Sequence, residues 1–293
     1  MTIINGWLNI NKPRGISSAA TVAIVKRAFN NVKTGHTGTL DPLAEGVLPI
    51  ALGEATKLAE MLIDAKKTYQ FTIQFGSKTS SGDIDGEIVS TTDKIVKESD
   101  INEIIPKFIG SIYQTPPAFS AIKIDGIRSY KLARSGYVPE LKRRKIYIYN
   151  LELLEFNAKK QTATLICECS KGTYIRTLSE DIGFSLQNLG HVVELIRLKV
   201  GKFAIASAIN VNDVKMQDNL QQLSSLIFPI DFVLDDILVI NVSEDEAKRI
   251  RNGQKLFFED VSEGCTAIYC NSILCAIGSI DSGLFNIKRV FNL

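Results

Sequence analysis

The spacing of apolar residues in this chain switches repeatedly between the period of a helix and the period of a strand. Every second residue from Tyr69 to Phe75 is apolar and the residues between are polar, which predicts a strand with one buried face. Similar reasoning predicts helices near 18–29, 55–62, 99–109 and 175–189, and strands at 145–156 and 161–170. Because these segments follow no regular strand–helix–strand repeat, we expect an α+β fold rather than a doubly wound parallel sheet.

A proline and three acidic residues interrupt the patterning at 228–236 (FPIDFVLDD). We therefore place a domain boundary there, with a first domain over 1–228 and a second over 236–293. The second domain contains short alternating segments separated by turn residues, which predicts a small, mostly β module.

Several classes of protein are disfavoured by what the sequence lacks. No apolar run approaches the roughly 18 residues needed to cross a bilayer, and the first residues do not resemble a signal peptide, so we expect a cytoplasmic protein without membrane contact. The five cysteines are an odd number, which fits reduced thiols better than a disulfide framework. With two histidines and widely spaced cysteines, neither a zinc site nor a Ser-His-Asp or Cys-His hydrolase is expected.

The formal net charge of +2 hides a strongly basic segment. Residues 121–150 contain eight basic and two acidic side chains, whereas the last third of the chain is acidic. A run of charge is often only a solvated face, but a local basic surface is also what a polyanionic partner requires.

A long loop at 31–46 (NVKTGHTGTLDPLAEG) contains one carboxylate, Asp41, that could act as a nucleophile or base, and one histidine, His36. Loops of this length inside a compact domain tend to be functional or disordered, and the apolar residues in this one disfavour disorder. Taken alone, an aspartate before a proline is more often a turn-former than a catalyst.

Segments distributed over most of residues 1–210 resemble, in order, the motifs of the bacterial TruB-type tRNA pseudouridine synthases. The loop motif GHTGTLDPLAEG at 35–46 is the most specific of them. The others are NINKPRGISS at 9–18, KTY at 67–69, TSSGDIDG at 79–86, TPPAFSAIK at 115–123, SKGTYIRTL at 170–178 and HVVELIRLKVGKF at 191–203.

This resemblance implies isomerisation of uridine to pseudouridine at position 55 in the T-loop of tRNA, on a mixed, largely antiparallel core. The N-glycosidic bond breaks, the uracil turns, and C5 bonds to the sugar carbon with loss of a proton. No group is donated and nothing is oxidised, so no cofactor is expected. Asp41 would attack the sugar carbon or remove the neighbouring proton, and the sequence does not choose between these routes.

By the same resemblance, Arg176 is the partner of Asp41. A fixed cation beside a carboxylate lowers its pKa by about 1–3 units and opposes the effect of burial. Tyr69 would stack on the flipped base and could take the C5 proton, and Leu195 would form an apolar wall. His36 would fill the space that the base leaves in the RNA, although it could simply be an exposed loop residue. Two further residues, Lys12 and Lys67, would support the pocket or touch phosphate.

In this family the segment that follows the 115–123 motif helps to clasp the T arm. Lys123, Arg143 and Arg144 are therefore candidate RNA contacts, which would position the RNA without reading its sequence. The second domain resembles a PUA-like RNA-binding module, although its acidic balance is unusual for one. No protein partner is implied, and a monomer is expected.

Two alternatives remain open at this stage. One is a synthase of the same fold that acts on another RNA with the help of a guide. The other is an RNA-binding or RNA-folding module whose catalysis is incidental or lost, which the joint presence of Asp41, Tyr69 and Arg176 disfavours.

Overall fold

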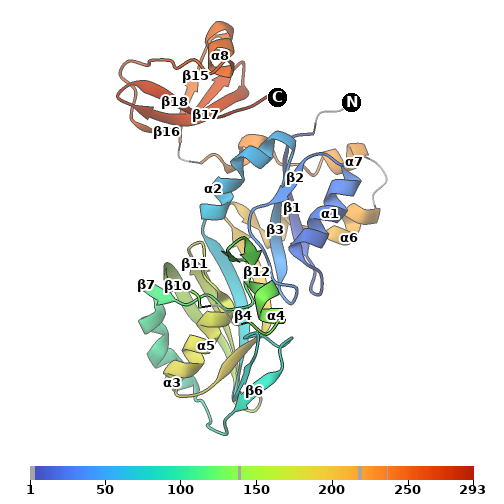
Figure 1. The fold of residues 1–293 in the computed structure, drawn as a ribbon, viewed down its shortest axis with the longest axis vertical. Helices are drawn as coiled ribbons and strands as arrows, with labels where there is room; N and C mark the ends of the chain where they lie inside the picture. The colour runs from blue at the N-terminus through green and yellow to red at the C-terminus, as the bar shows by residue number, and fades with distance from the viewer. Residues whose placement is uncertain (1–3, 138–139, 217–219, 236) are drawn as a thin grey trace.

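The structure, a computed structural model, describes residues 4–137, 140–216, 220–235 and 237–293. Its centre is a ten-stranded mixed sheet with the order β14-β1-β3-β12-β4-β11-β10-β7, to which β2 (Thr34–His36) and β13 (Phe203–Ala204) add at the side (Figure 1). The path strands are β1 (Gly6–Lys12), β3 (Glu45–Leu52), β4 (Lys67–Phe75), β7 (Gly110–Gln114), β10 (Arg144–Asn157), β11 (Thr162–Cys169), β12 (Gly190–Val200) and β14 (Ile209–Asn210).

Most neighbouring strands of this sheet run antiparallel, and the pairs β1–β14 and β3–β12 are parallel. The expected α+β class with a mixed, largely antiparallel core is thus confirmed. The predicted strand at 67–76 is β4, and Phe71, Ile73 and Phe75 on its apolar face are buried. The strands expected at 145–156 and 161–170 are β10 and β11.

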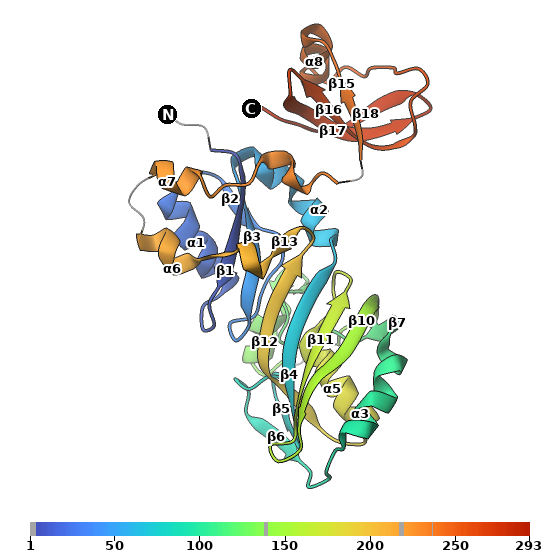
Figure 2. The same ribbon diagram turned by 180° about the vertical axis from the view of Figure 1, so that it is seen from behind.

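A short contact between β3 and β12 joins the two halves of the sheet, β14-β1-β3 and β12-β4-β11-β10-β7. β3 and β12 pair only at Ile196↔Glu45 and Arg197↔Gly46, whereas β12 and β4 run side by side along their length (Figure 2). Gly46 has a φ of +103°, and a Cβ there would lie 2.3 Å from the carbonyl oxygen of Arg197. Glycine is required at this position because it tolerates the conformation and lets the two backbones approach closely.

Helices cover the two halves of the sheet. α1 (Ser18–Ala28) begins at Ser17, whose side chain accepts a hydrogen bond from the Ala20 amide as a helix cap. α2 (Ala59–Asp64) follows the 3-10 turn η1 (Gly53–Leu58), and α3 (Glu98–Ile104) continues into η2 (Ile105–Phe108). α6 (Val211–Met216) packs against α1, and α7 (Leu220–Ser224) follows it.

α5 (Ile175–Ser185) lies on the buried face of β4 and β12 (Figure 1). We predicted a helix reaching Leu189, and that boundary is wrong. The chain leaves the helix after Ser185, and Gln187 takes a positive φ of 52°. Asn188 then uses its side chain to accept a hydrogen bond from the Gly76 amide, which fixes the turn into β12.

A separate four-stranded sheet forms the C-terminal unit, in the order β15-β16-β17-β18. Its strands are β15 (Leu238–Asn241), β16 (Gly264–Cys270), β17 (Ile273–Asp281) and β18 (Leu284–Val290), as the short alternating segments predicted. α8 (Glu244–Arg251), which we did not predict, begins with a capping box formed by Ser243 and Glu246. Residue 236, at the start of the expected second domain, is outside the described residues.

The two units are joined around the single tryptophan. Trp7 is fully buried, and its indole Nε1 donates to the carbonyl oxygen of Ile230 at 2.9 Å, just before the C-terminal unit begins. The apolar cluster around Trp7 includes Phe203 of the first unit and Leu274 and Phe291 of the second. Burial of apolar side chains from both units therefore holds them together.

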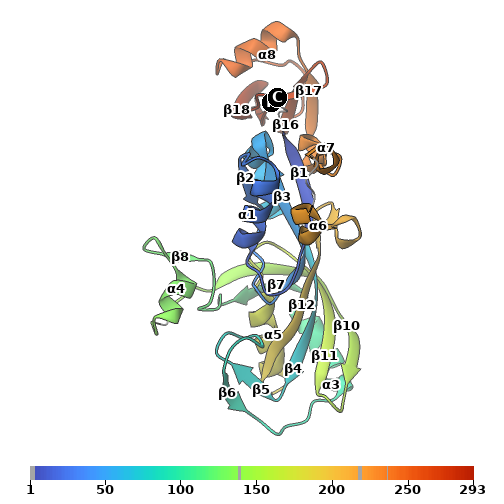
Figure 3. The same ribbon diagram turned by 90° about the vertical axis from the view of Figure 1, so that its right-hand side faces the viewer.

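The first part of the basic segment, residues 123–134, stands away from the sheet as a short arm, whereas its last residues, from Arg144 onward, belong to β10 (Figure 3). The arm consists of the hairpin β8 (Lys123–Ile124) and β9 (Ile127–Arg128), followed by α4 (Ser129–Arg134). The hydroxyl group of Ser129 donates to the Ala118 carbonyl, and the Tyr130 amide donates to Ser120, so the base of the arm is tied to the 115–123 segment.

The described helices include none that is both long and apolar enough to span a membrane. All five cysteines are free thiols.

Replacing Gly46 with Ala should lower the free energy of unfolding by at least about 2 kcal/mol, because a positive φ costs of the order of 1–3 kcal/mol and the added Cβ meets the β12 backbone. Urea unfolding followed by the fluorescence of buried Trp7 would measure it. Gly126→Ala is the matched control, since Gly126 has a φ of +83° but nothing within 4 Å of an added Cβ. Equal losses in both variants would show that the close approach of β3 and β12 is unimportant.

Candidate active site

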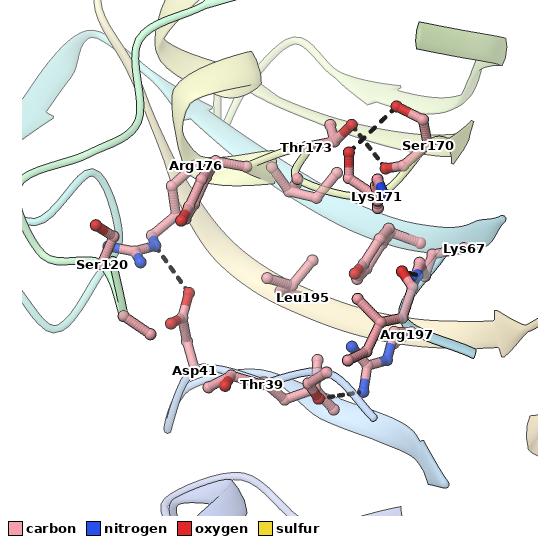
Figure 4. A pocket seen from close by; sticks show the side chains of 18 of the residues that line it. Thr39, Asp41, Lys67, Ser120, Ser170, Lys171, Thr173, Arg176, Leu195 and Arg197 are labelled. Carbon is pink, nitrogen blue, oxygen red and sulfur yellow. Dashed lines mark hydrogen bonds and ion pairs between the residues drawn. The ribbon is translucent and has the colours of Figure 1, made fainter. Parts of the chain in front are cut away.

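A cavity of about 270 Å³ opens where the two halves of the sheet meet (Figure 4). It is lined by the loop after β2, the first residues of β4, the middle of β12 and the start of α5. The lining includes Thr37–Asp41, Lys67, Tyr69, Ser120, Tyr174–Arg176, Leu195 and Arg197. Ligand pockets typically measure about 300–1,000 Å³, so this cavity has the size to hold one small group.

The loop that carries Asp41 is held in place from several sides. The Ser18 hydroxyl accepts from the Leu40 amide at 2.8 Å and donates to the Leu40 carbonyl oxygen at 3.0 Å. The Gly15 amide donates to the Pro42 carbonyl oxygen at 2.7 Å, and the side chains of Leu40 and Leu43 are buried. The loop is therefore ordered by apolar anchors, as its composition predicted.

Asp41 forms an ion pair with Arg176. Nε of Arg176 lies 2.9 Å from Oδ2 of Asp41, and the Arg176 side chain is only 4% exposed. Nη1 of Arg176 donates to the carbonyl oxygen of Ser81 and Nη2 to that of Phe119, at 2.9 and 2.8 Å. The guanidinium is thus fixed by three segments that are distant in the sequence, and it orients the carboxylate.

Asp83 is a second carboxylate beside Arg176 and was absent from our predicted site. Its Oδ2 lies 3.6 Å from Nε of Arg176, and the Ser81 hydroxyl donates to its Oδ1 at 2.5 Å. Burial raises the pKa of Asp83, while the bond from Ser81 and the charge of Arg176 oppose the rise. The sequence did indicate this region, because TSSGDIDG at 79–86 resembles a family motif. That resemblance alone did not assign a role to either of its two aspartates.

Tyr69, Leu195 and Arg197 line the side of the cavity formed by β4 and β12. Tyr69 pairs with Arg197 across the two strands. Burial raises the pKa of the Tyr69 phenol, and the nearby Arg197 guanidinium opposes this rise. Arg197 was also absent from our predicted site, although a lone arginine between Ile196 and Leu198 in an apolar strand was a visible signal.

The two predicted lysines have their ammonium groups turned to backbone carbonyls. Lys12 is fully buried and donates to the carbonyl oxygens of Pro13 and Ile16 at 2.9 and 2.8 Å. Lys67 lines the cavity and donates to the last carbonyl groups of α2 and to Ala65. Burial lowers the pKa of each lysine to about 8. Of our two alternatives for these lysines, these contacts favour support of the pocket over phosphate contact.

The remaining predicted residues lie outside the cavity wall. His36 is half-buried at the end of β2, its Nδ1 accepts from the Gly38 amide at 3.3 Å, and burial lowers its pKa. Lys123 is exposed in the β8–β9 hairpin. Arg143 is exposed against the ring of Tyr113, and Arg144 lies 5.6 Å from the centre of the Tyr174 ring, at the edge of the cavity.

Replacing Lys67 with Met should make the free energy of unfolding rise less steeply with pH between about 8 and 10. The wild-type lysine has a pKa of about 8 when folded and its ordinary value of 10.5 when unfolded, so in this window the unfolded chain binds more protons. Stability of the wild type therefore rises with pH relative to the variant. Urea unfolding at several pH values would measure the difference. The contribution of Lys12 to the pH dependence is the same in both proteins and does not affect the comparison. Parallel pH dependences would contradict the burial of the Lys67 ammonium.

Two family models match the chain. The model of the TruB family pseudouridylate synthase N-terminal domain matches residues 26–175, and that of the tRNA pseudouridylate synthase B C-terminal domain matches residues 176–235. The tRNA pseudouridine synthase B of Rickettsia bellii (strain OSU 85-389) is 50% identical over 288 residues, which are 98% of each chain. That of Rickettsia akari (strain Hartford) is 48% identical over 294 residues, 99% of each chain.

Solved structures show the same fold. The Cbf5–Nop10–Gar1 complex contains a chain that matches with a TM-score of 0.73 and 25% identity, over 97% of this chain and 84% of that one. The structure of an H/ACA RNP bound to a substrate RNA containing 2'-deoxyuridine gives a TM-score of 0.74 at 23% identity, over 98% and 85% of the two chains. With a family model over half its length and relatives that match it almost end to end, this chain belongs to the TruB family of pseudouridylate synthases.

Proposed function

We propose that this chain isomerises uridine to pseudouridine at position 55 in the T-loop of tRNA, with Asp41 as the catalytic carboxylate. The observation that carries the proposal is the ion pair between Asp41 and the buried Arg176, in the wall of a cavity with the size to hold one small group. Position 55 comes from the resemblance to TruB-type enzymes. The tRNA substrate is further supported by the names of relatives about 50% identical to this chain.

The reaction moves one negative charge from the enzyme to the base. If Asp41 attacks C1′, its lone pair forms the new C–O bond and the electron pair of the N1–C1′ bond leaves with uracil. If Asp41 instead removes the proton at C2′, the carboxylate becomes neutral, the C2′–H electron pair forms a C1′=C2′ double bond, and the N1–C1′ pair again leaves with uracil. By either route Asp41 must begin ionised, and Arg176 stabilises that form because it places a cation 2.9 Å from the carboxylate oxygen.

The base must leave the RNA stack to reach Asp41. Tyr69 offers an aromatic surface and Leu195 an apolar one inside the cavity, and stacking of a base on an aromatic side chain contributes about 1–3 kcal/mol.

After uracil has turned, C5 bonds to C1′. In the first route the bond from C1′ to the Asp41 oxygen breaks, and in the second the C1′=C2′ double bond opens as Asp41 returns its proton to C2′, so the carboxylate is regenerated in both. The proton on C5 must then be removed and N1 must gain one. The Tyr69 hydroxyl, kept neutral because burial raises its pKa, is the group that we assign to relay this proton, giving up its own proton toward N1 as its oxygen accepts the one from C5.

The two alternatives are less well supported. A guide-dependent synthase is favoured only by structural neighbours at 23–25% identity, against relatives at 50% named as tRNA enzymes. A module without catalysis would not need Asp41 and Arg176 paired at 2.9 Å beside a cavity. We expect the enzyme to act as a monomer in the cytoplasm, where its five free thiols would remain reduced.

Replacing Asp41 with Asn should reduce isomerisation at least about 1,000-fold, because an amide can neither attack C1′ nor remove a proton. Release of tritium from tRNA labelled at C5 of uridine measures the reaction. Asp235→Asn is the control, since Asp235 also pairs with a cation, Lys202, but is not among the residues that line the cavity. Equal release by wild type and Asp41→Asn would remove Asp41 from the mechanism.

The same assay tests the position. A tRNA transcript with cytidine in place of U55 should release no tritium above background, and undiminished release would overturn the assignment to position 55. Binding of tRNA by the wild type with no release from any transcript would favour the RNA-folding alternative.

Replacing both Arg143 and Arg144 with Ala should weaken tRNA binding and flatten its dependence on salt. Removal of one cation from a phosphate reduces the slope of log K against log salt by roughly 0.7–0.9, so the slope should fall by about 1–2. The double variant Lys159→Ala and Lys160→Ala, at the exposed turn between β10 and β11, controls for net charge. Binding titrations at several salt concentrations would decide, and an unchanged slope would make the basic segment a solvated face.

A further inference from the structure

Arg197 is a buried cation at the point where the two halves of the sheet meet. Its side chain is 2% exposed, yet it lines the cavity. Nε donates to the carbonyl oxygen of Val47 at 2.7 Å and Nη2 to that of Gly38 at 3.1 Å. These bonds fix the guanidinium in one orientation and use two of its five N–H groups.

Arg197 differs from Arg176 in having no acidic partner. In the described parts of the chain, no carboxylate oxygen lies within 4.0 Å of its guanidinium. The ionisable groups near Arg197 include Lys12, Lys67 and His36. Burial lowers the pKa of each of them, and the positive charge of Arg197 adds to the lowering. Burial of a charge without a counter-ion is unfavourable, and two neutral carbonyl groups compensate for it only in part.

The cavity separates this cation from the reacting carboxylate. Figure 4 shows Asp41 and Arg176 on one side, Arg197 and Lys67 on the other, and Leu195 between them. A base between these walls would have the pair Asp41–Arg176 at its sugar side and Arg197 near its far edge. The charge that leaves Asp41 during bond cleavage would therefore move toward Arg197.

We propose that Arg197 stabilises the negative charge that develops on the uracil as the N1–C1′ bond breaks. The proposal rests on the proposed function and adds a second arginine to it. Arg176 stabilises the negative charge while it is on Asp41, and Arg197 stabilises it once the electron pair has passed to the uracil ring. Because both cations are held rigidly before the reaction, little reorganisation is needed when the charge moves.

The structure also offers Arg197 a purely mechanical role, because its bond to Gly38 helps to hold the Asp41 loop. The two roles respond differently to the leaving group. A 5-fluorouracil anion is intrinsically more stable, since fluorine withdraws electron density, so it needs less help from a cation. A misplaced loop would instead slow uridine and 5-fluorouridine equally.

The test compares wild type with Arg197→Gln in single-turnover cleavage of the N1–C1′ bond. The substrates are two T-arm RNA hairpins with uridine or 5-fluorouridine at the target position, and conversion is followed by nucleoside chromatography. We expect a loss of about 100-fold with uridine, the size seen when one charge-stabilising group is removed, and at most about tenfold with 5-fluorouridine. Both rates come from one preparation, so any loss of folded protein cancels from their ratio.

Two further variants complete the design. Arg197→Lys keeps the charge and should keep the wild-type ratio of the two rates even where both fall. Ser18→Ala disturbs the same loop through Leu40 without removing a charge, and its ratio should also equal that of the wild type. Equal losses with both substrates in Arg197→Gln would overturn the proposal while leaving the function intact. Failure of the wild type to convert uridine would instead overturn the proposed function.

Discussion

The short contact between β3 and β12 determines where everything else in the site can lie. Only two residue pairs join these strands, and one of them depends on Gly46 to admit the backbone of Arg197. Each half of the sheet contributes different functional residues to this junction. The β1–β3 half supplies the loop with Asp41, and the β4–β12 half supplies Tyr69, Leu195 and, through α5, Arg176. The cavity exists because two well-packed halves meet at so narrow a junction.

The local fold was largely predictable because its signals are local. The alternation of β4, the cap of α1 at Ser17 and the short strands of the C-terminal unit follow from side chains within a few residues of one another. The end of α5 was not, because the turn that follows it is fixed by a hydrogen bond from the Gly76 amide to the Asn188 side chain, more than a hundred residues away. α8 was missed because its sequence is mostly charged and carries little apolar stripe, although the Ser243–Glu246 capping box marks its start.

The site was predictable to the extent that it resembles a known family. Asp41, Tyr69, Leu195 and Arg176 do come together, and their roles remain predictions. Asp83 and Arg197 were missed for a physical reason, since each matters through distant partners. Asp83 belongs to the site only because it contacts the guanidinium of Arg176, some ninety positions away in the sequence. Arg197 is defined by the carbonyl groups of Gly38 and Val47 and by the lack of a neighbouring acid among the described residues, neither of which a strand pattern reveals.

The way in which the buried cations are held has a chemical consequence. Lys12, Lys67 and Arg197 all donate to backbone carbonyl oxygens, whereas Arg176 pairs with carboxylates. A carboxylate beside Arg197 would cancel its field and could compete with Asp41 as a base. Carbonyl groups satisfy the N–H donors but add no net charge, so the positive field in the cavity stays available to an incoming anion. An overall charge close to zero is thus compatible with a polarised interior. The Asp41–Arg176 pair lies on one wall of the cavity, and Arg197, without a carboxylate partner among the described residues, lies on the other.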